Sequence, residues 1–117
     1  MAKILVHIIH GPENPTKAAL GFLVAKAAIA EGHTVTLFLA GDGVQLMRDE
    51  VLDNLTGLGT GSLRESYDAV VSAGAKIYIS GMSAKARGIN IENKPVQAAM
   101  PNMLVQLAVD ADRMFIY

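Results

Sequence analysis

The chain has 117 residues, of which 51% are hydrophobic and 18% are charged, with a formal net charge of −1 and no cysteine. This length predicts a single domain spanning residues 1–117, and the apolar content argues against disorder. The charge gives no general attraction to nucleic acid or an anionic membrane, and the missing cysteines exclude disulfides, thiolate metal sites and a cysteine nucleophile within these residues.

The first third of the chain predicts two strands joined by a helix. Ile4–Ile9 and Thr34–Ala40 are unalternated apolar runs, typical of strands covered on both faces. Between them, Asn14 suits a helix N-cap and Pro15 the first helical position, and an alanine-rich helix follows until Gly32 stops it. The opening apolar run is too short for a signal peptide or a membrane span, so we expect a cytoplasmic protein.

The remaining elements are shorter. A tight turn at residues 41–43 precedes one helical turn, and the three glycines that end residues 53–61 predict a mobile loop. Ser62 and Glu65 form a capping-box pattern at the start of a helix. The segments then expected are the helix Leu63–Ala73, the strand Lys76–Ile79, a loop over Ser80–Gly88, a polar stretch over 89–94, the helix Asn102–Asp110 and the strand Arg113–Tyr117.

This order predicts an α/β fold with three layers, α/β/α, around a mostly parallel sheet of four to five strands. Ligands of such sheets gather outside the carboxyl ends of the strands. Three segments should meet at that edge, namely residues 10–14, 41–43 and 80–87.

The strand and turn TLFLAGDGV, the loop SAKARGI and the ending AVDADRMFIY together resemble the DsrE/DsrF-like family of small sulfur-relay and related proteins. The resemblance covers nearly the whole chain. It implies the DsrE/DsrF-like fold and a homo-oligomer, a trimer or hexamer, or an assembly with related subunits. Active members carry a persulfide-forming cysteine just ahead of a loop that ends in Arg-Gly.

Counting back from Arg87-Gly88, Ser80 holds the place of that cysteine. A persulfide carrier needs a thiol that ionises to a thiolate and then holds a terminal sulfur. A serine hydroxyl can do neither, so sulfur transfer through this position is excluded.

The polar residues at the predicted edge are candidates for binding a small anion. The start of the first helix offers free N–H groups and a favourable dipole, and basic side chains add charge-assisted hydrogen bonds. The candidate ligand-binding residues are His10, Asn14, Asp42, Ser80, Ser83, Lys85 and Arg87.

Each candidate also has a plainer interpretation. Ser80 caps the next helical turn or bonds the loop backbone, and for Ser83 we favour an N-cap role for the residues that follow it. Asp42, between two glycines, and His10, beside Gly-Pro, serve turns. Arg87 either binds an anion or braces a subunit interface through a neighbour's carboxylate. Sequence alone does not separate these two roles.

The histidines do not have the spacing of metal ligands, and neither GxGxxG nor GxxxxGK[ST] is present, so we expect no metal and no cofactor. His7 lies within the first strand, where we expect it to be packed or to face an oligomer contact.

Three functional hypotheses remain. The favoured one is a non-catalytic oligomeric binding or scaffold subunit with an anion-friendly cleft. The second is an enzyme using Ser80, His10 and Asp42, or a sulfur-relay component acting with a cysteine-bearing partner. The third is a nucleotide or small-acid binder that uses the start of the first helix and Arg87. We assign no catalytic residue, and we expect no nucleic-acid or membrane partner.

Overall fold

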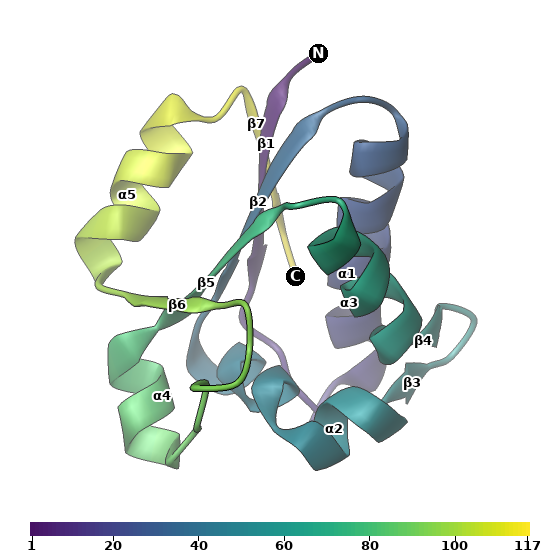
Figure 1. The fold of residues 1–117 in the computed structure, drawn as a ribbon, viewed down its shortest axis with the longest axis vertical. Helices are drawn as coiled ribbons and strands as arrows, with labels where there is room; N and C mark the ends of the chain where they lie inside the picture. The colour runs from purple at the N-terminus through teal and green to yellow at the C-terminus, as the bar shows by residue number, and fades with distance from the viewer.

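The structure is a computed structural model that describes residues 1–117. Five parallel strands form the central sheet in the order β6-β5-β2-β1-β7, as Figure 1 shows. The strands are β1 (Lys3–Ile8), β2 (Thr34–Leu39), β5 (Lys76–Ser80), β6 (Gln97–Ala99) and β7 (Arg113–Ile116).

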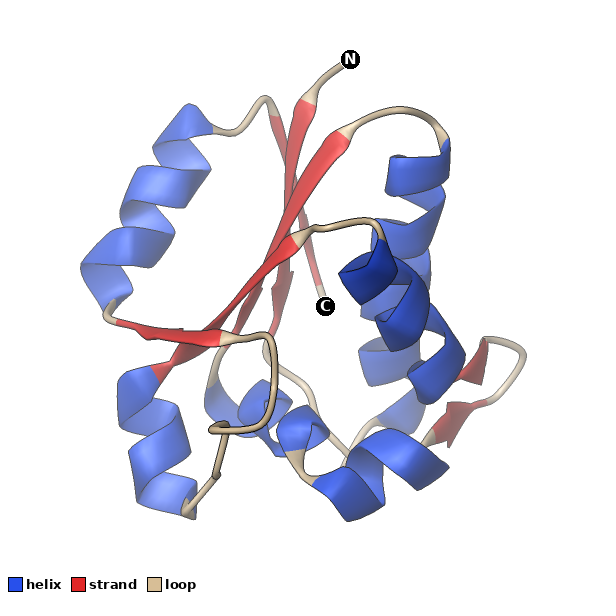
Figure 2. Ribbon diagram, in the orientation of Figure 1, coloured by secondary structure: helices blue, strands red, loops and turns tan.

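Helices lie on both sides of this sheet (Figure 2). The helices α1 (Pro15–Ala30) and α3 (Leu63–Ser72) cover one face, and α5 (Pro101–Asp110) lies on the opposite side. The predicted three-layer α/β/α architecture with a parallel sheet is therefore confirmed. The edge strand β6, which pairs with β5, was not anticipated, because its three residues are too few to show a pattern.

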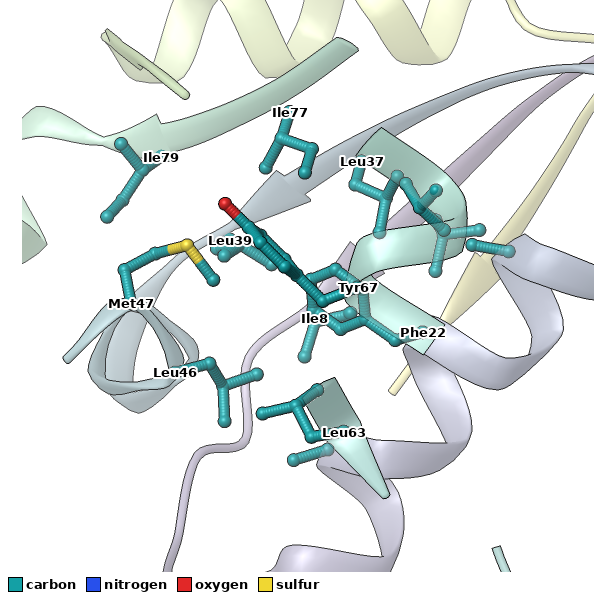
Figure 3. Packing of buried hydrophobic residues seen from close by; sticks show 14 of the residues in the cluster. Ile8, Phe22, Leu37, Leu39, Leu46, Met47, Leu63, Tyr67, Ile77 and Ile79 are labelled. Atoms are coloured by element: carbon teal, nitrogen blue, oxygen red, sulfur yellow. The ribbon is translucent and has the colours of Figure 1, made fainter. Parts of the chain in front are cut away.

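The main core lies between the sheet and the pair α1 and α3. Figure 3 shows Phe22 and Tyr67 packed over the aliphatic side chains of the strands, and their ring centroids are 6.0 Å apart. Both helices begin at the predicted caps. The side chain of Asn14 accepts a hydrogen bond from the Lys17 amide, and that of Ser62 accepts one from the Glu65 amide. Each cap satisfies a helix N–H that has no partner within the helix.

Two predicted loops contain regular structure. The prediction of a loop over residues 80–88 is wrong, because Gly81–Arg87 forms the helix α4. Gly88 caps the end of this helix with a positive φ of 64°. Residues 53–61 include the end of α2 (Asp49–Asn54), and the strands β3 (Thr56–Gly57) and β4 (Gly61–Ser62) pair as a hairpin. Both elements are too short for a periodic sequence signal, and contacts with the rest of the fold stabilise them.

The carboxyl edge of the sheet is closely packed. After β2, the 3-10 helix η1 (Gly41–Met47) folds back against the end of β1. A Cβ atom at Gly43 would lie 2.3 Å from the carbonyl oxygen of Ile8, and one at Gly11 would lie 2.2 Å from the carbonyl oxygen of Asp42. Glycine is therefore required at both positions by the close approach of backbone rather than by a turn.

The substitution Gly43→Ala should lower the free energy of unfolding by about 2 kcal/mol, because the new methyl group overlaps rigid backbone. Gly81→Ala is the matched control, since its nearest neighbour would be 3.7 Å away. Urea denaturation of both variants measures the difference. Equal stabilities of the two variants would contradict the close packing of η1 against β1.

Candidate functional site

Ser80 ends β5 and is 8% exposed. Its Oγ accepts a hydrogen bond of 3.2 Å from the Ser83 amide and thereby caps α4. This confirms the plainer interpretation of Ser80 as a helix cap. The residue at the position of the family's cysteine is therefore held inside the fold by a structural hydrogen bond.

Ser83 does not cap a helix, because α4 begins before it, at Gly81. Our favoured interpretation of Ser83 is therefore wrong. Its Oγ accepts a hydrogen bond of 3.0 Å from the amide of Gly41, so it joins α4 to the start of η1. This contact joins residues 42 positions apart, which no local pattern of sequence could have indicated.

Arg87 pairs with Asp42 of its own chain, with 3.1 Å between Nε and Oδ1. Its Nη1 also donates to the Ser83 carbonyl oxygen at 3.3 Å, and its own carbonyl oxygen accepts a hydrogen bond from Arg48. The carboxylate partner of Arg87 in this structure thus comes from η1 of its own chain. Lys85, on the same helix, is exposed and makes no ion pair.

His10 and Asn14 lie in the loop between β1 and α1. The side chain of Asn14 is engaged in capping α1, whereas Nδ1 of His10 is buried without a hydrogen-bond partner. In the same loop, the carboxylate of Glu13 accepts a hydrogen bond of 2.8 Å from the amide of Gly11. Glu13 and Arg48 both shape this edge and were missed, since each depends on a turn or a tertiary contact that spacing does not reveal.

No hydrogen bonds connect Ser80, His10 and Asp42 into a catalytic relay. The Ser80 hydroxyl accepts from backbone, the Asp42 carboxylate binds Arg87, and Nδ1 of His10 has no partner. A serine nucleophile requires an adjacent base that is itself oriented by a third group. The arrangement provides a braced corner of the fold rather than an activated nucleophile.

The two principal surface grooves lie away from this corner. One, of about 460 Å³, is at the amino end of the sheet, where Lys3, Lys76 and Asp110 contribute charged side chains. The other, of about 410 Å³, lies between α2, α3 and residues 90–95. There the ammonium group of Lys94 beside Asp49 lowers the pKa of that carboxyl group below its usual value.

No group of three or more histidine, aspartate or glutamate side chains is arranged to hold a metal ion. No helix is both long enough and apolar enough to cross a membrane.

The fold and this corner define a small α/β protein whose sheet edge carries a capping serine ahead of an Arg-Gly pair. The sequence model of the DsrE/DsrF-like family matches residues 2–116, and the chain belongs to that family.

The chain is 32% identical over 83 residues to the uncharacterized protein MJ0760 of Methanocaldococcus jannaschii. That match covers 71% of this chain but 30% of the relative, so the chain spans less than a third of the relative's length.

Two solved structures share the fold. The ychN protein from E. coli aligns over 100% of both chains with a TM-score of 0.82 and 17% identity. BT1422 from Bacteroides thetaiotaomicron, a conserved protein of unknown function, aligns over 97% of this chain and 94% of its own, with a TM-score of 0.71 and 12% identity.

Removing the Arg87 side chain should destabilise the protein, because it connects α4 to η1. We expect Arg87→Ala to lower the free energy of unfolding by about 1 kcal/mol, the scale of a partly exposed ion pair with one further hydrogen bond. Lys85→Ala, the control on the same helix, should change it little. Urea denaturation compares them, and equal effects would show that the pair with Asp42 does not stabilise this corner.

Proposed function

We propose that this chain is a non-catalytic, homo-oligomeric binding or scaffold subunit of the DsrE/DsrF-like family. The observation that carries the proposal is the exposure of the edge strand β7 and of α5. All four residues of β7 are exposed, and α5 has no buried residue. Ile116 is 57% exposed and Val109 is 82% exposed.

Parallel sheets are normally covered on both faces, and an uncovered edge strand is a site for pairing with another chain. Five of the ten exposed large hydrophobic residues lie on α5 and β7, which follow one another in the chain, and such a concentration is typical of an interaction surface. We call this surface the α5/β7 face. Its exposed apolar residues are Val105, Val109, Met114 and Ile116; Phe115, which is also exposed, lies on the other side of β7.

We propose no catalytic activity because the Ser80 hydroxyl and the Asp42 carboxylate, at the carboxyl edge described above, both make hydrogen bonds within the fold. A sulfur relay acting with a cysteine-bearing partner is the alternative, and it would require that partner's sulfur to approach Ser80. The nearly complete burial of Ser80 and its role as a cap disfavour this route.

The proposed oligomer predicts that a charged side chain introduced on the α5/β7 face weakens assembly. In sedimentation velocity, the wild-type chain should have the mass of a trimer or a larger assembly. Val105→Glu should shift it toward monomer, because an unpaired carboxylate would be buried at the contact. Val105 is exposed in the single chain, so its fold should be unaffected.

Leu58→Glu is the matched control, since Leu58 is 91% exposed but lies at the tip of the β3–β4 hairpin. This variant should assemble as the wild type does. A wild-type chain that stays monomeric at high concentration would contradict the proposal, and dissociation by Leu58→Glu alone would place the contact elsewhere.

A second candidate function, binding of a small anion or nucleotide, is favoured by one observation. Nδ1 of His10 is buried and unpartnered, four residues before the cap of a 16-residue helix. A bound phosphate could accept a hydrogen bond from this imidazole while it contacts the helix start.

This candidate predicts that inorganic phosphate raises the melting temperature more than chloride does at equal ionic strength. His10→Ala should abolish that difference, and His33→Ala, a control at the other end of the sheet, should retain it. Differential scanning fluorimetry measures both variants. An unchanged phosphate effect in His10→Ala would exclude this binding mode.

A further inference from the structure

The groove between α2, α3 and residues 90–95 is lined in part by a core tyrosine. Tyr67 reaches this groove although it is only 4% exposed. Its ring packs beside Phe22, and Figure 3 shows its hydroxyl at the far end of the ring, pointing away from Phe22. The polar end of this side chain is thus directed away from the packed aromatic rings.

The Tyr67 hydroxyl makes no hydrogen bond within the chain. It is also not among the unpartnered atoms that are sealed from solvent, which are His7 Nε2, His10 Nδ1 and Thr60 Oγ1, so it reaches the groove. Burial raises the pKa of Tyr67 above its usual value, and the hydroxyl therefore keeps its proton and can both donate and accept. Polar groups buried to this extent normally have a partner, and a molecule in the groove would supply one.

A second nearly buried polar group lies in the same groove. The side chain of Lys94 is 12% exposed, and its ammonium group donates a hydrogen bond to Oδ1 of Asp49. An ammonium group has three N–H donors, so this contact leaves others for a bound molecule. Two deeply placed polar groups, one from α3 and one from the segment before β6, therefore meet at one groove.

The charges around the groove balance. Its charged side chains are two carboxylates and two cations, namely Asp49, Asp68, Arg64 and Lys94. Each carboxylate is paired with one of the cations, and Arg64 Nε lies 3.2 Å from Oδ1 of Asp68. An ionic ligand of either sign would compete with one of these pairs. A neutral polar ligand can instead form charge-assisted hydrogen bonds with both pairs and leave them intact.

The remaining groups favour a ligand with hydroxyls over a planar aromatic one. The guanidinium carbon of Arg64 lies 5.5 Å from the centroid of the Tyr67 ring, so that face of the ring is not free for stacking. Oδ1 of Asn90 accepts a hydrogen bond from the Glu92 amide, which leaves its side-chain N–H groups free, and Asn93 is exposed beside it. A sugar hydroxyl both donates and accepts, so it matches carboxylates, amides and a phenol together.

We propose that this groove binds a neutral polyhydroxylated molecule of the size of a monosaccharide. The Tyr67 hydroxyl and the Lys94 ammonium group are its most deeply placed hydrogen-bond partners. The groove volume of about 410 Å³ lies within the range of small-molecule sites, about 300 to 1,000 Å³. The site shares no residue with the α5/β7 face, so the inference goes beyond the proposed assembly and does not depend on it.

The test is titration of the ¹⁵N-labelled chain with D-glucose, D-galactose, D-ribose and myo-inositol, followed by NMR spectroscopy. At least one of these probes should shift the amide signals of residues 90–95 in a saturable way in the millimolar range. Acetate, an anion, and glycine, a zwitterion, should not do so at the same concentrations. Tighter binding of acetate or glycine than of every neutral probe would overturn the ligand class.

Tyr67→Phe removes the hydroxyl and keeps the ring. It should raise the Kd of the bound probe about tenfold, the effect of losing one hydrogen bond. Tyr78→Phe is the matched control, because Tyr78 lines the other groove, and it should bind as the wild type does. Without a probe, the melting temperature of Tyr67→Phe should equal that of the wild type, since the lost hydroxyl has no partner in the fold.

Three further results would overturn the inference. They are the absence of saturable binding by any neutral probe, which would leave water as the partner of the hydroxyl, an unchanged Kd in Tyr67→Phe, and a fall in its melting temperature. If Tyr67→Phe does not fold, Asn93→Ala alters an exposed side chain of the groove and should weaken binding in its place. Asn102→Ala, on α5, is the control for that variant, and equal Kd values in these two variants would also contradict the site.

Discussion

The organisation of this protein depends on how a parallel sheet is covered. The central strands β1, β2 and β5 carry apolar residues on both sides, so each face must be shielded from water. On one face, α1 and α3 provide a core of large side chains. On the other, α5 crosses between opposite edges of the sheet without burying any of its own residues completely. The single chain therefore leaves β7 and α5 exposed, and these are the elements that the proposed second copy would cover.

At the carboxyl edge of the sheet, the polar side chains that could take part in a reaction make hydrogen bonds and ion pairs within the chain instead. Ser80 caps α4, Ser83 binds the backbone of η1, and Arg87 is paired with Asp42. With no cysteine available, this corner contributes rigidity, and the nitrogen of His10 is the group there without a partner. Stability at this edge and the proposed association through the α5/β7 face thus involve separate residues.

Sequence alone predicted the layers, the parallel sheet, and the caps Asn14 and Ser62, because these depend on local patterns of apolar and capping residues. It missed α4 and β6, which are too short to show the repeating pattern of apolar residues by which a helix or strand is recognised. The contacts of Ser83 and Arg87 join elements about 40 residues apart and follow from the packing of α4 against η1. The cap role of Ser80 was among the interpretations because a serine hydroxyl readily accepts a hydrogen bond from a backbone amide a few residues further along the chain.

The central claim is that a second copy covers the α5/β7 face. Hydrogen exchange followed by mass spectrometry at increasing protein concentration tests it most directly. The account predicts that the amides of β7 and α5 exchange more slowly as concentration rises, while those of α1, buried within one chain, stay unchanged. Exchange in β7 and α5 that does not depend on concentration would contradict the account.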